Sequence, residues 1–323
     1  MSVSSESHKK PLIIIAGPTA AGKTNLSVKL AQKIGGEIIS ADSMQVYRHM
    51  DIGSAKITQE EMQMIPHYGI DCLSPFEDYN VQIFQTLAKT ALNQIYEHGT
   101  IPIVAGGTGF YIQALLYDIE FTEHSKLDGY RKELETKAQT EEGIHELYGM
   151  LKRVDPASCA LIHENNVKRV IRALEYYHET GRPISTHNEE QKQKESPYDF
   201  RYFVITDERQ ALYERIDKRV DLMLQNGLVE EVQRLKEMGL NRSYVSMQGI
   251  GYKEILAYLD GEISLEEAVY IVKRDTRHFA KRQLTWFRRQ PDVIWIDRNI
   301  LGSEEAMLEK MMQMLPDRKL SEI

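Results

Sequence analysis

PLIIIAGPTAAGKTNLSVKLAQKIGG, residues 11–36, joins three structural signals in one continuous stretch. The apolar run at residues 11–17 is short, which is typical of a buried parallel strand. After a glycine-rich segment, apolar residues recur at four-residue spacing, at Leu26, Leu30 and Ile34. This spacing predicts a helix, and Gly35 and Gly36 should end it, because glycine adopts the left-handed conformation without strain. The stretch therefore predicts a strand, a loop and a helix in succession.

The same alternation continues on both sides of a charged middle region. Apolar runs that predict further strands are EIIS (37–40), IPIVAGGTG (101–109), RYFVIT (201–206) and VIWID (293–297). Residues 81–98 carry a helical repeat that stops at Gly99. Strands that alternate with helices predict an α/β fold, in which a parallel sheet is covered by helices on both faces.

The middle region predicts an all-helical insertion. Strand-like runs are absent from residues 120–198, and HNEEQKQKESP (187–197) has almost no apolar residue, which favours a solvated connection. At 323 residues the chain exceeds what one core usually supports. We therefore expect a core domain of residues 9–119 and 199–323, interrupted by a helical domain of residues 120–198.

The composition is that of an ordinary globular protein, with 42% apolar and 27% charged residues. Cys72 and Cys159 are too few for a disulfide framework and fit a reducing cytoplasm. Neither a signal peptide nor a membrane span is predicted. The net charge of −8 argues weakly against a nucleic-acid partner, so the position of the 40 basic residues matters.

GPTAAGKT (17–24) matches the phosphate-binding pattern G-x-x-x-x-G-K-[ST], and it lies between a predicted strand and a predicted helix. Its backbone amides and the helix start favour an anion. Lys23 can reach the outer phosphate oxygens, and the Thr24 hydroxyl can hold Mg²⁺. The motif, a P-loop, predicts a site for a diphosphate or triphosphate without saying which.

Two aspartates follow predicted strands and have several interpretations. Asp42 could organise a metal, act as a general base or simply cap a helix, and Asp297 is a second candidate for the metal role. Because most P-loops bind ATP or GTP, these motifs alone favour a kinase of a nucleotide or small metabolite, or a nucleic-acid-binding ATPase.

Residues 264–289 carry the strongest nucleic-acid signal. At about 100° per residue, four cations fall on one side of the predicted helix, namely Arg274, Arg277, Lys281 and Arg288. The opposite side is apolar, with Leu265, Val269, Val272, Phe279, Trp286 and Phe287. Because Asp275 is the one acidic neighbour in this row, we expect the cations to face outward and bind phosphates. A second basic cluster, Lys168, Arg169 and Arg172, lies in residues 165–181, where Asn165 and Asn166 could cap the helix.

The combined motifs resemble those of the bacterial tRNA dimethylallyltransferase (tRNA isopentenyltransferase) family along nearly the whole chain. The matching segments are GPTAAGKT (17–24), ADSMQVYRHMDIGSAK (41–56), VAGGTGFYIQALL (104–116), VDPASCALIHENNVKRVIRALE (154–175), GLVEEVQRL (227–235), MQGIGYKE (247–254) and TRHFAKRQLTWFR (276–288). His49 and Ser54 replace residues that the family often has as Gly and Thr, and neither is an expected reacting group.

The resemblance implies transfer of a dimethylallyl group from dimethylallyl diphosphate to the exocyclic amine (N6) of the adenosine on the 3′ side of the anticodon. It implies catalytic roles for Asp42, Thr24, Lys23 and Arg219, with Asp42 taking the proton of the amine. The implied diphosphate-binding residues are Gly17, Thr19, Ala20, Ala21, Gly22, Lys23, Thr24 and Arg219, and the implied metal is Mg²⁺ at Thr24.

The resemblance also implies tRNA, through its anticodon stem-loop, as a partner. The implied contacts are Asp42, Ser43, Met44, Gln45, Thr108, Arg131, Asn166, Val167, Lys168, Arg169, Val170, Gln248, Lys253, Lys281, Arg282, Gln283 and Arg288. The adenine should flip out of its stack to reach the site, as in other base-modifying enzymes. We expect a cytoplasmic monomer without a membrane partner.

Overall fold

The computed structural model describes residues 9–121 and 128–316 of the chain. The chain divides into two compact units, one of Met1–Leu116 with Pro197–Ile323 and one of Tyr117–Ser196. The second unit thus begins at residue 117, where the sequence predicts 120, and ends at residue 196, where the sequence predicts 198.

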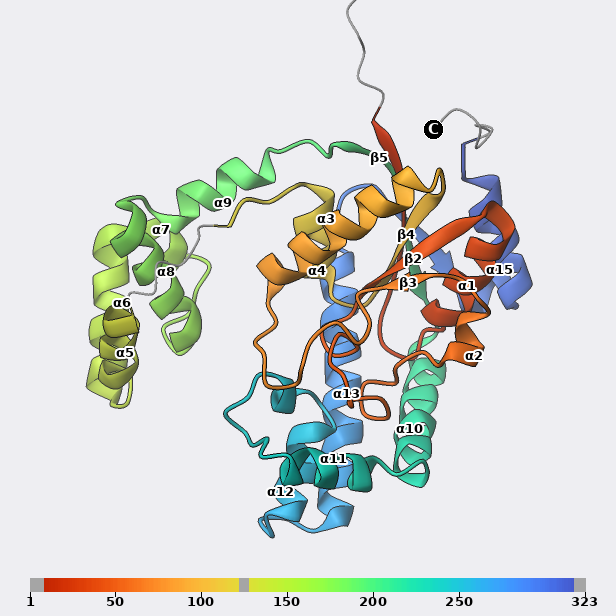
Figure 1. Cartoon of the computed structure of the whole chain (residues 1–323). Helices are drawn as coiled ribbons and strands as arrows, with labels where there is room; N and C mark the ends of the chain where they lie inside the picture. Colours follow the sequence, from red (N-terminus) through yellow and green to blue (C-terminus); the bar gives the residue numbers. More distant parts are fainter. Residues whose placement is uncertain (1–8, 122–127, 317–323) are drawn as a thin grey trace, which may run out of the picture. The chain divides into compact units, whose positions relative to one another are not determined.

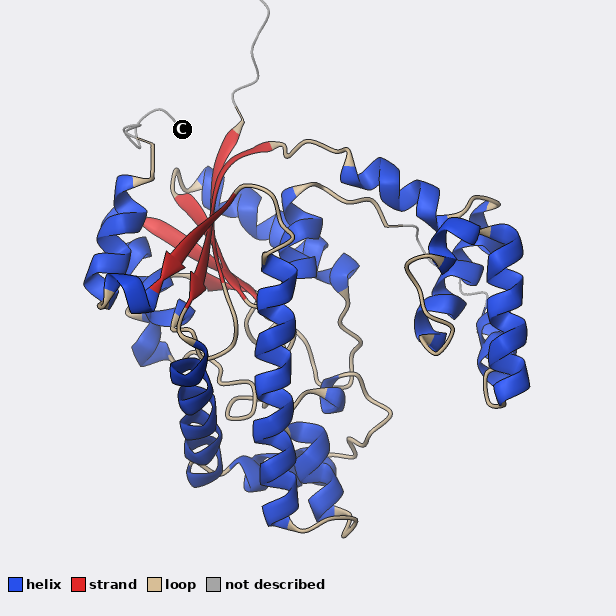
Figure 2. Cartoon of the chain, turned by 180° about the vertical axis from the view of Figure 1, so that it is seen from behind, coloured by secondary structure: helices blue, strands red, loops and turns tan. Residues whose placement is uncertain are grey.

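The first unit is built on a parallel sheet in the strand order β3-β2-β4-β1-β5-β6 (Figures 1 and 2). The strands are β1 (Lys10–Ala16), β2 (Gly36–Ala41), β3 (His67–Tyr68), β4 (Ile101–Gly106), β5 (Tyr198–Thr206) and β6 (Val293–Asp297). Every pairing between them is parallel, which confirms the predicted α/β fold. Because β1 lies between β4 and β5, the loop that follows it opens at the middle of the carboxyl edge, where such sheets bind ligands.

The helices of the first unit account for most of the remaining chain. They are α1 (Lys23–Ile34), α2 (Gln59–Met62), α3 (Val81–Glu97), α4 (Gly109–Leu116), α10 (Arg209–Gln225), α11 (Leu228–Glu237), the 3₁₀ turn η1 (Ser246–Gln248), α12 (Tyr252–Leu259), α13 (Leu265–Phe287), α14 (Arg298–Leu301) and α15 (Glu304–Gln313). None of the helices in the described ranges combines the length and the apolar character needed to cross a bilayer.

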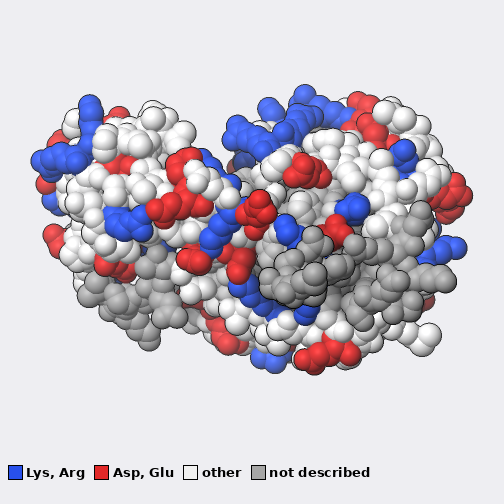
Figure 3. All heavy atoms as spheres, turned by 90° about the horizontal axis from the view of Figure 1, so that it is seen from above, with Lys and Arg blue, Asp and Glu red and all other residues white. Residues whose placement is uncertain are grey.

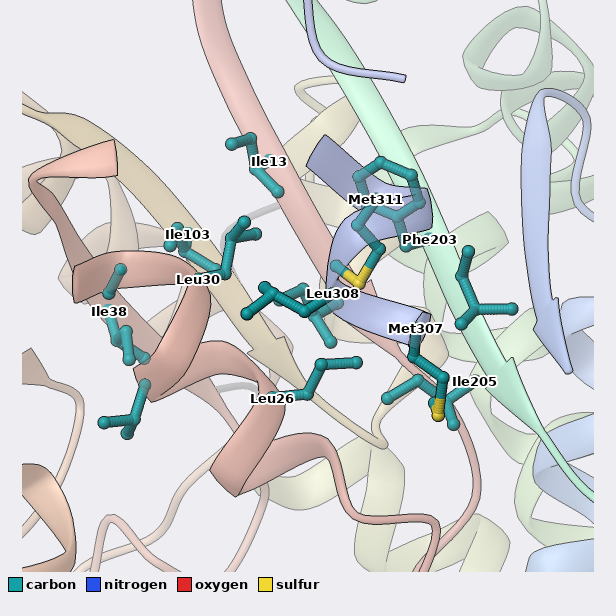
Figure 4. Packing of buried hydrophobic residues seen from close by; sticks show 14 of the residues in the cluster. Ile13, Leu26, Leu30, Ile38, Ile103, Phe203, Ile205, Met307, Leu308 and Met311 are labelled. Carbon is teal, nitrogen blue, oxygen red and sulfur yellow. The ribbon is translucent and has the colours of Figure 1, made fainter. Parts of the chain in front are cut away.

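One face of the sheet packs against α1 and α15. Alternate strand residues, including Ile13 and Phe203, point to this face and meet Leu26 and Leu30 of α1 and the methionines of α15 (Figure 4). Leu26 and Leu30 are completely buried, and burial of such a side chain stabilises the fold by about 1.5–3 kcal/mol. This core fixes the start of α1, and with it the glycine-rich loop.

The other face of the sheet is covered by α3, α4 and α13. Helix α3 contacts β2 and β4, and α4 contacts β4. Phe287 near the end of α13 packs edge-on against Tyr202 of β5, with ring centroids 6.5 Å apart. The predicted cover on both faces is therefore confirmed, and α13 is held by its apolar side.

The prediction for the two glycines after α1 is confirmed for Gly35 and wrong for Gly36. Gly35 ends the helix with a left-handed φ of 66°, as expected. Gly36 instead begins β2, where a Cβ atom would lie 2.8 Å from the carbonyl oxygen of Ile101. The second glycine is thus needed for the close approach of two strands.

The described residues of the second unit form helices joined by turns, and they contain no strand. Its helices are α5 (Asp128–Lys137), α6 (Glu141–Val154), α7 (Pro156–Cys159), α8 (Val167–Thr180) and α9 (Ile184–Lys192). They enclose a separate core that includes Leu134, Leu147, Leu151, Val170, Ile171 and Leu174.

Helix α9 corrects the predicted solvated connection at residues 187–197, because it continues to Lys192. It contains no buried residue. Its first turn is anchored by the buried Asp155, whose carboxylate accepts hydrogen bonds from the backbone N–H and Oγ of Ser185 at 3.0 and 2.6 Å. A helix held by polar contacts at one end has no apolar periodicity for sequence analysis to detect.

Candidate active site

The P-loop, residues 17–24, curls at the carboxyl end of β1 and leads directly into α1. Gly17 and Gly22 have φ values of 149° and 86°, and a Cβ atom at Gly17 would lie 2.7 Å from the carbonyl oxygen of Ile205. Ala20 also adopts a left-handed φ, of 61°. Such a conformation is costly for alanine and is concentrated at functional sites. The loop has the geometry that its motif predicts.

A pocket opens beside the P-loop, where β1, β2 and β4 end. Asp42 directly follows the end of β2, and Gly107 directly follows β4. Polar side chains of the P-loop, of Asp42 and of Arg219 line one part of this pocket. Its apolar lining comes from Ile38, Ile57, Ile70 and Phe279. The pocket therefore offers a charged region beside an apolar wall.

Two cations dominate the electrostatics of this pocket. The ammonium of Lys23 donates to the carbonyl of Pro18 at 2.7 Å. Burial, together with the charge of Arg219, lowers the pKa of Lys23 to about 8, although Asp42 acts in the opposite direction. Burial also lowers the pKa of Arg219, which Asp42 and Glu61 partly offset. Two crowded cations beside one pocket carboxylate favour the binding of an anion.

Asp42 is fixed by one of its two carboxylate oxygens. Its Oδ1 accepts hydrogen bonds from the backbone N–H groups of Met44 at 2.8 Å and Gln45 at 3.3 Å. Within the described part of the chain, its Oδ2 accepts none. The cap interpretation and the chemical interpretation of Asp42 are therefore compatible, since the residue holds a turn and still offers a free oxygen.

Gln283 was predicted to contact RNA, but its side chain is buried against the P-loop. Only 7% of the residue is exposed, and its Oε1 accepts the backbone N–H of Thr19 at 2.9 Å. Its Nε2 donates to the carbonyl of Gly107 at 2.9 Å. The side chain thus lines the pocket beside the P-loop, on the buried side of α13.

The back of the P-loop is braced by side chains that the sequence did not single out. Arg215 donates through Nε to the carbonyl of Ala20 at 3.0 Å, and Arg298 donates to the carbonyl of Ala21 at 3.3 Å. Arg215 also forms an ion pair of 2.6 Å with the buried carboxylate of Asp207. These residues lie about 190 or more positions from the loop, so no local pattern could reveal them.

Asp297 departs from its sequence-based interpretation, and His67 lines the pocket without having been singled out in the sequence. Asp297 caps α14 by accepting the N–H groups of Asn299 and Ile300 at 2.9 and 3.3 Å, and it is not among the residues that line the pocket beside the P-loop, so nothing in the pocket supports its candidate metal role. His67 lines the pocket, with Nδ1 2.8 Å from the carbonyl oxygen of Ile65, and burial lowers its pKa.

The loop after Asp42 is held in place by the buried carboxylate of Glu231. Glu231 is 1% exposed and accepts the backbone N–H groups of Asp51, Ile52 and Gly53 at 2.8, 2.8 and 3.0 Å. It also accepts the hydroxyl of Tyr252 at 2.8 Å. The segments around residues 51, 231 and 252, which the family resemblance had brought together only as motifs, therefore form one hydrogen-bonded unit.

The residues of the pocket fit a magnesium ion held mainly by a phosphate ligand. Thr24 lines the pocket and supplies a hydroxyl oxygen beside the P-loop amides. Magnesium commonly uses one or two protein oxygens together with phosphate oxygens and water. No group of three or more His, Cys, Asp or Glu side chains that could hold a metal ion occurs among the described residues.

The outer side of α13 is basic, although less uniformly than predicted. Lys281, Arg282 and Arg288 are exposed and form no ion pair with a carboxylate in residues 9–121 and 128–316. Arg277 instead pairs with Asp217 of α10 at 2.5 Å, and Arg274 pairs with its neighbour Asp275 at 2.8 Å. The prediction that this row lacks acidic partners is wrong for Arg277, because α10 packs beside it.

Other predicted RNA contacts of the first unit lie at its surface or in turns. Gln248 is exposed, and Lys253 is half-buried beside Glu254. Thr108 is half-buried in the turn between β4 and α4, and its carbonyl accepts the N–H of Tyr111 at 2.9 Å. Ser43, Met44 and Gln45 belong to the turn that Asp42 caps. Figure 3 shows that Lys and Arg side chains gather on part of the face seen from above, among acidic groups.

The helical unit places its predicted contacts unequally. Lys168 and Arg169 are exposed, and Asn166 begins α8 without a side-chain capping bond. Val170 is 1% exposed in the core of the unit, so its side chain cannot contact RNA. Arg131 pairs with Glu175 at 2.9 Å, and half-buried Arg172 has its pKa lowered chiefly by burial. The basic surface of α8 is thus smaller than the sequence predicts.

A parallel sheet with a P-loop, two crowded cations and a carboxylate at its carboxyl edge defines a P-loop enzyme that binds a diphosphate or triphosphate. A family model described as IPP transferase matches residues 45–290, and one described as isopentenyl transferase matches residues 10–71. The chain therefore belongs to the IPP transferase family, and it is an enzyme of the prenyltransferase class. The resemblance read from the motifs is confirmed.

Similar proteins carry the same description. The chain is 58% identical over 311 residues to a tRNA dimethylallyltransferase of Lachnoclostridium phytofermentans, covering 96% of this chain and 99% of that protein. A tRNA dimethylallyltransferase of Acetivibrio thermocellus is 50% identical, with 93% and 96% covered.

Solved structures agree with these relatives. The full-length tRNA isopentenylpyrophosphate transferase of Bacillus halodurans has a TM-score of 0.71 and 43% identity, with 95% of each chain covered. A eukaryotic dimethylallyltransferase acting on tRNA has a TM-score of 0.81 and 31% identity, with 94% of this chain and 77% of that chain covered.

Proposed function

We propose that this enzyme transfers a dimethylallyl group from dimethylallyl diphosphate to the N6 amine of the adenosine on the 3′ side of the anticodon in tRNA. The observation that carries the proposal is the pocket in which Lys23 and Arg219 crowd together at the P-loop, with Asp42 as the nearby carboxylate. The apolar wall of the same pocket suits a five-carbon chain. The names of the similar proteins support the choice of donor and of tRNA.

The chemistry follows from the charges that develop. The bond between the allylic carbon and the diphosphate oxygen breaks, while a bond forms between that carbon and the adenine nitrogen. The P-loop amides, Lys23 and Arg219 stabilise the departing diphosphate. The nitrogen loses a proton, which the free oxygen of Asp42 accepts. Thr24 would hold Mg²⁺ at the P-loop, and the ion would supply further neutralisation of charge on the leaving diphosphate.

The acceptor must leave its stack, because the pocket lies at the sheet edge and cannot receive a stacked base. The turn 42–45 and Thr108 would hold the extruded base. The exposed cations Lys281, Arg282 and Arg288, together with Lys168 and Arg169, would hold phosphates of the anticodon stem-loop. We propose that the enzyme acts as a monomer.

The test is mass spectrometry of anticodon-loop nucleosides after incubation of the enzyme with unmodified tRNA, Mg²⁺ and dimethylallyl diphosphate. A mass increase of one dimethylallyl group on the adenosine beside the anticodon is expected. Transfer of labelled phosphate from ATP to a nucleotide or metabolite, without any prenylated nucleoside, would instead establish a P-loop kinase.

Two aspartate variants test whether Asp42 accepts the proton. Asp42→Asn should bind inorganic diphosphate normally and lose about 10²–10⁴-fold in turnover, the usual range for a general base. Asp292→Asn is the matched control, because Asp292 is exposed and its left-handed φ of 58° suits asparagine. Wild-type turnover by Asp42→Asn would remove Asp42 from the chemistry.

A further inference from the structure

Gln283 occupies an unusual position, because its carboxamide joins the two glycine-rich turns of the pocket. Its Oε1 accepts from Thr19 in the P-loop, and its Nε2 donates to Gly107 in the turn after β4, each at 2.9 Å. In the described part of the chain, no other side chain hydrogen-bonds to both turns. The two turns follow β1 and β4, which are adjacent in the sheet.

The space around this carboxamide is closely fitted. A Cβ atom at Gly107 would meet the Nε2 atom of Gln283 and would also lie 3.4 Å from the carbonyl oxygen of Gly17. Glycine at position 107 therefore leaves the room that the carboxamide fills. With both polar ends bonded and 7% exposure, the Gln283 side chain has a single defined position.

The helix that carries Gln283 is itself anchored. Ala280 and Phe287, one turn on either side, are completely buried on the same face of α13. The adjacent residues Lys281 and Arg282 are exposed on the outer face. One turn of α13 thus contributes both a group that holds the donor pocket and cations that face solvent.

We propose that Gln283 is a positioning residue that fixes the P-loop against the Gly107–Thr108 turn, and thereby aligns the donor carbon with the acceptor nitrogen. The inference rests on the proposed function, in which the P-loop holds the diphosphate and Thr108 lies on the acceptor side. Gln283 itself takes no part in bond making. Its carboxamide sets the separation of two turns that hold different substrates.

The consequence of this role is a loss of rate with little loss of binding. Each substrate keeps its own set of contacts when Gln283 is replaced, but the two sets can shift relative to each other. Misplacement by about 1 Å can cost on the order of 10²-fold in rate, because reacting atoms must meet within a narrow range of distance and angle.

The first experiment uses Gln283→Leu, which preserves volume and removes both hydrogen bonds. Single-turnover prenylation should fall by about 10- to 100-fold. The dissociation constants for inorganic diphosphate and for unmodified tRNA should stay within about threefold of the wild-type values. A separate variant, Gln290→Leu, is the matched control. Gln290 lies beyond the end of α13, and this variant should react at the wild-type rate.

The second experiment asks whether Gln283 and Gly107 act through the same contact. Gly107→Ala should displace the carboxamide and lower the single-turnover rate to a similar extent. In the double variant Gln283→Ala with Gly107→Ala, the methyl group enters vacated space, so the combined loss should be no greater than the larger single loss. Additive losses would contradict the shared contact.

The outcomes separate this inference from the proposed function. An unchanged rate in Gln283→Leu would overturn the positioning role, and so would an equal loss of diphosphate binding and rate, which would make Gln283 simply part of the anion site. If Gln283→Leu unfolds, Gly107→Ala supplies the same comparison. If the wild-type enzyme prenylates no tRNA, the proposed function fails, whereas its binding of diphosphate stays measurable.

Discussion

Two carboxylates beside the pocket hold backbone turns in different ways. Glu231 uses both oxygens and accepts four hydrogen bonds, from three backbone N–H groups and the Tyr252 hydroxyl. Asp42 uses only Oδ1 and keeps Oδ2 free beside Lys23 and Arg219. The saturated group can serve structure alone, while the half-satisfied group can accept a proton. The number of hydrogen bonds that each carboxylate accepts therefore distinguishes the structural role of Glu231 from the chemical role of Asp42, although both residues lie in family motifs.

Among the residues around Asp42, the largest expected effect comes from removing the positive charge that balances it. Arg219→Ala should lower turnover by about 10²–10³-fold, because a preorganised group that stabilises developing charge contributes about 2.7–4 kcal/mol. Steady-state prenylation kinetics with both substrates varied provide the measurement. Lys218→Ala, an exposed neighbour on α10, is the control. Equal activity of the two variants would place Arg219 outside the reacting site.

Substitution of Glu231, whose carboxylate has all its hydrogen bonds within the protein, should change the free energy of unfolding. Glu231→Gln keeps the shape of the side chain and loses the charged acceptor, so it should lower the free energy of unfolding by about 2–3 kcal/mol. Chemical denaturation measures this change. Glu230→Gln, its exposed neighbour, should change stability by less than about 0.5 kcal/mol. A stable Glu231→Gln enzyme with a selective loss of chemistry would contradict the division between the two carboxylates.

A pH dependence of donor binding tests the cation pair. Burial and Arg219 lower the pKa of Lys23 to about 8, so the ammonium is charged below this pH and loses its proton above it. Diphosphate affinity should therefore weaken above pH 8, by up to about tenfold per pH unit, and binding there should take up a proton. Calorimetry in buffers of different ionisation enthalpy measures the uptake. In Lys23→Met the proton uptake should disappear.

The smallest effect is expected on the outer face of α13. Lys281→Ala should weaken tRNA binding by about 1 kcal/mol and reduce the slope of log affinity against log salt by about 1, because one phosphate contact is lost. Filter binding across salt concentrations measures both. Lys33→Ala, at the exposed end of α1, is the control. An unchanged salt slope would show that Lys281 does not neutralise a phosphate.

The sequence by itself determined the α/β fold, the P-loop and the family, because these depend on local order. A buried strand, a glycine at a left-handed position and a lysine beside a threonine all occur within a few residues of one another. The apolar period of α13 correctly placed Val272 and Phe287 on its buried side, whereas Leu265, predicted on the same side, is 37% exposed. The short β3 and the anchored α9 lacked such patterns, and the prediction missed both.

Only the tertiary structure decided how distant residues complete the pocket. Gln283 and Thr19 are 264 positions apart, and Arg298 and Ala21 are 277 positions apart. The partners of Arg277 and the four bonds of Glu231 likewise depend on which helices pack together. Hydrogen bonds act over about 3 Å in space and carry no record in the spacing of residues along the chain, so folding alone brings these groups into contact.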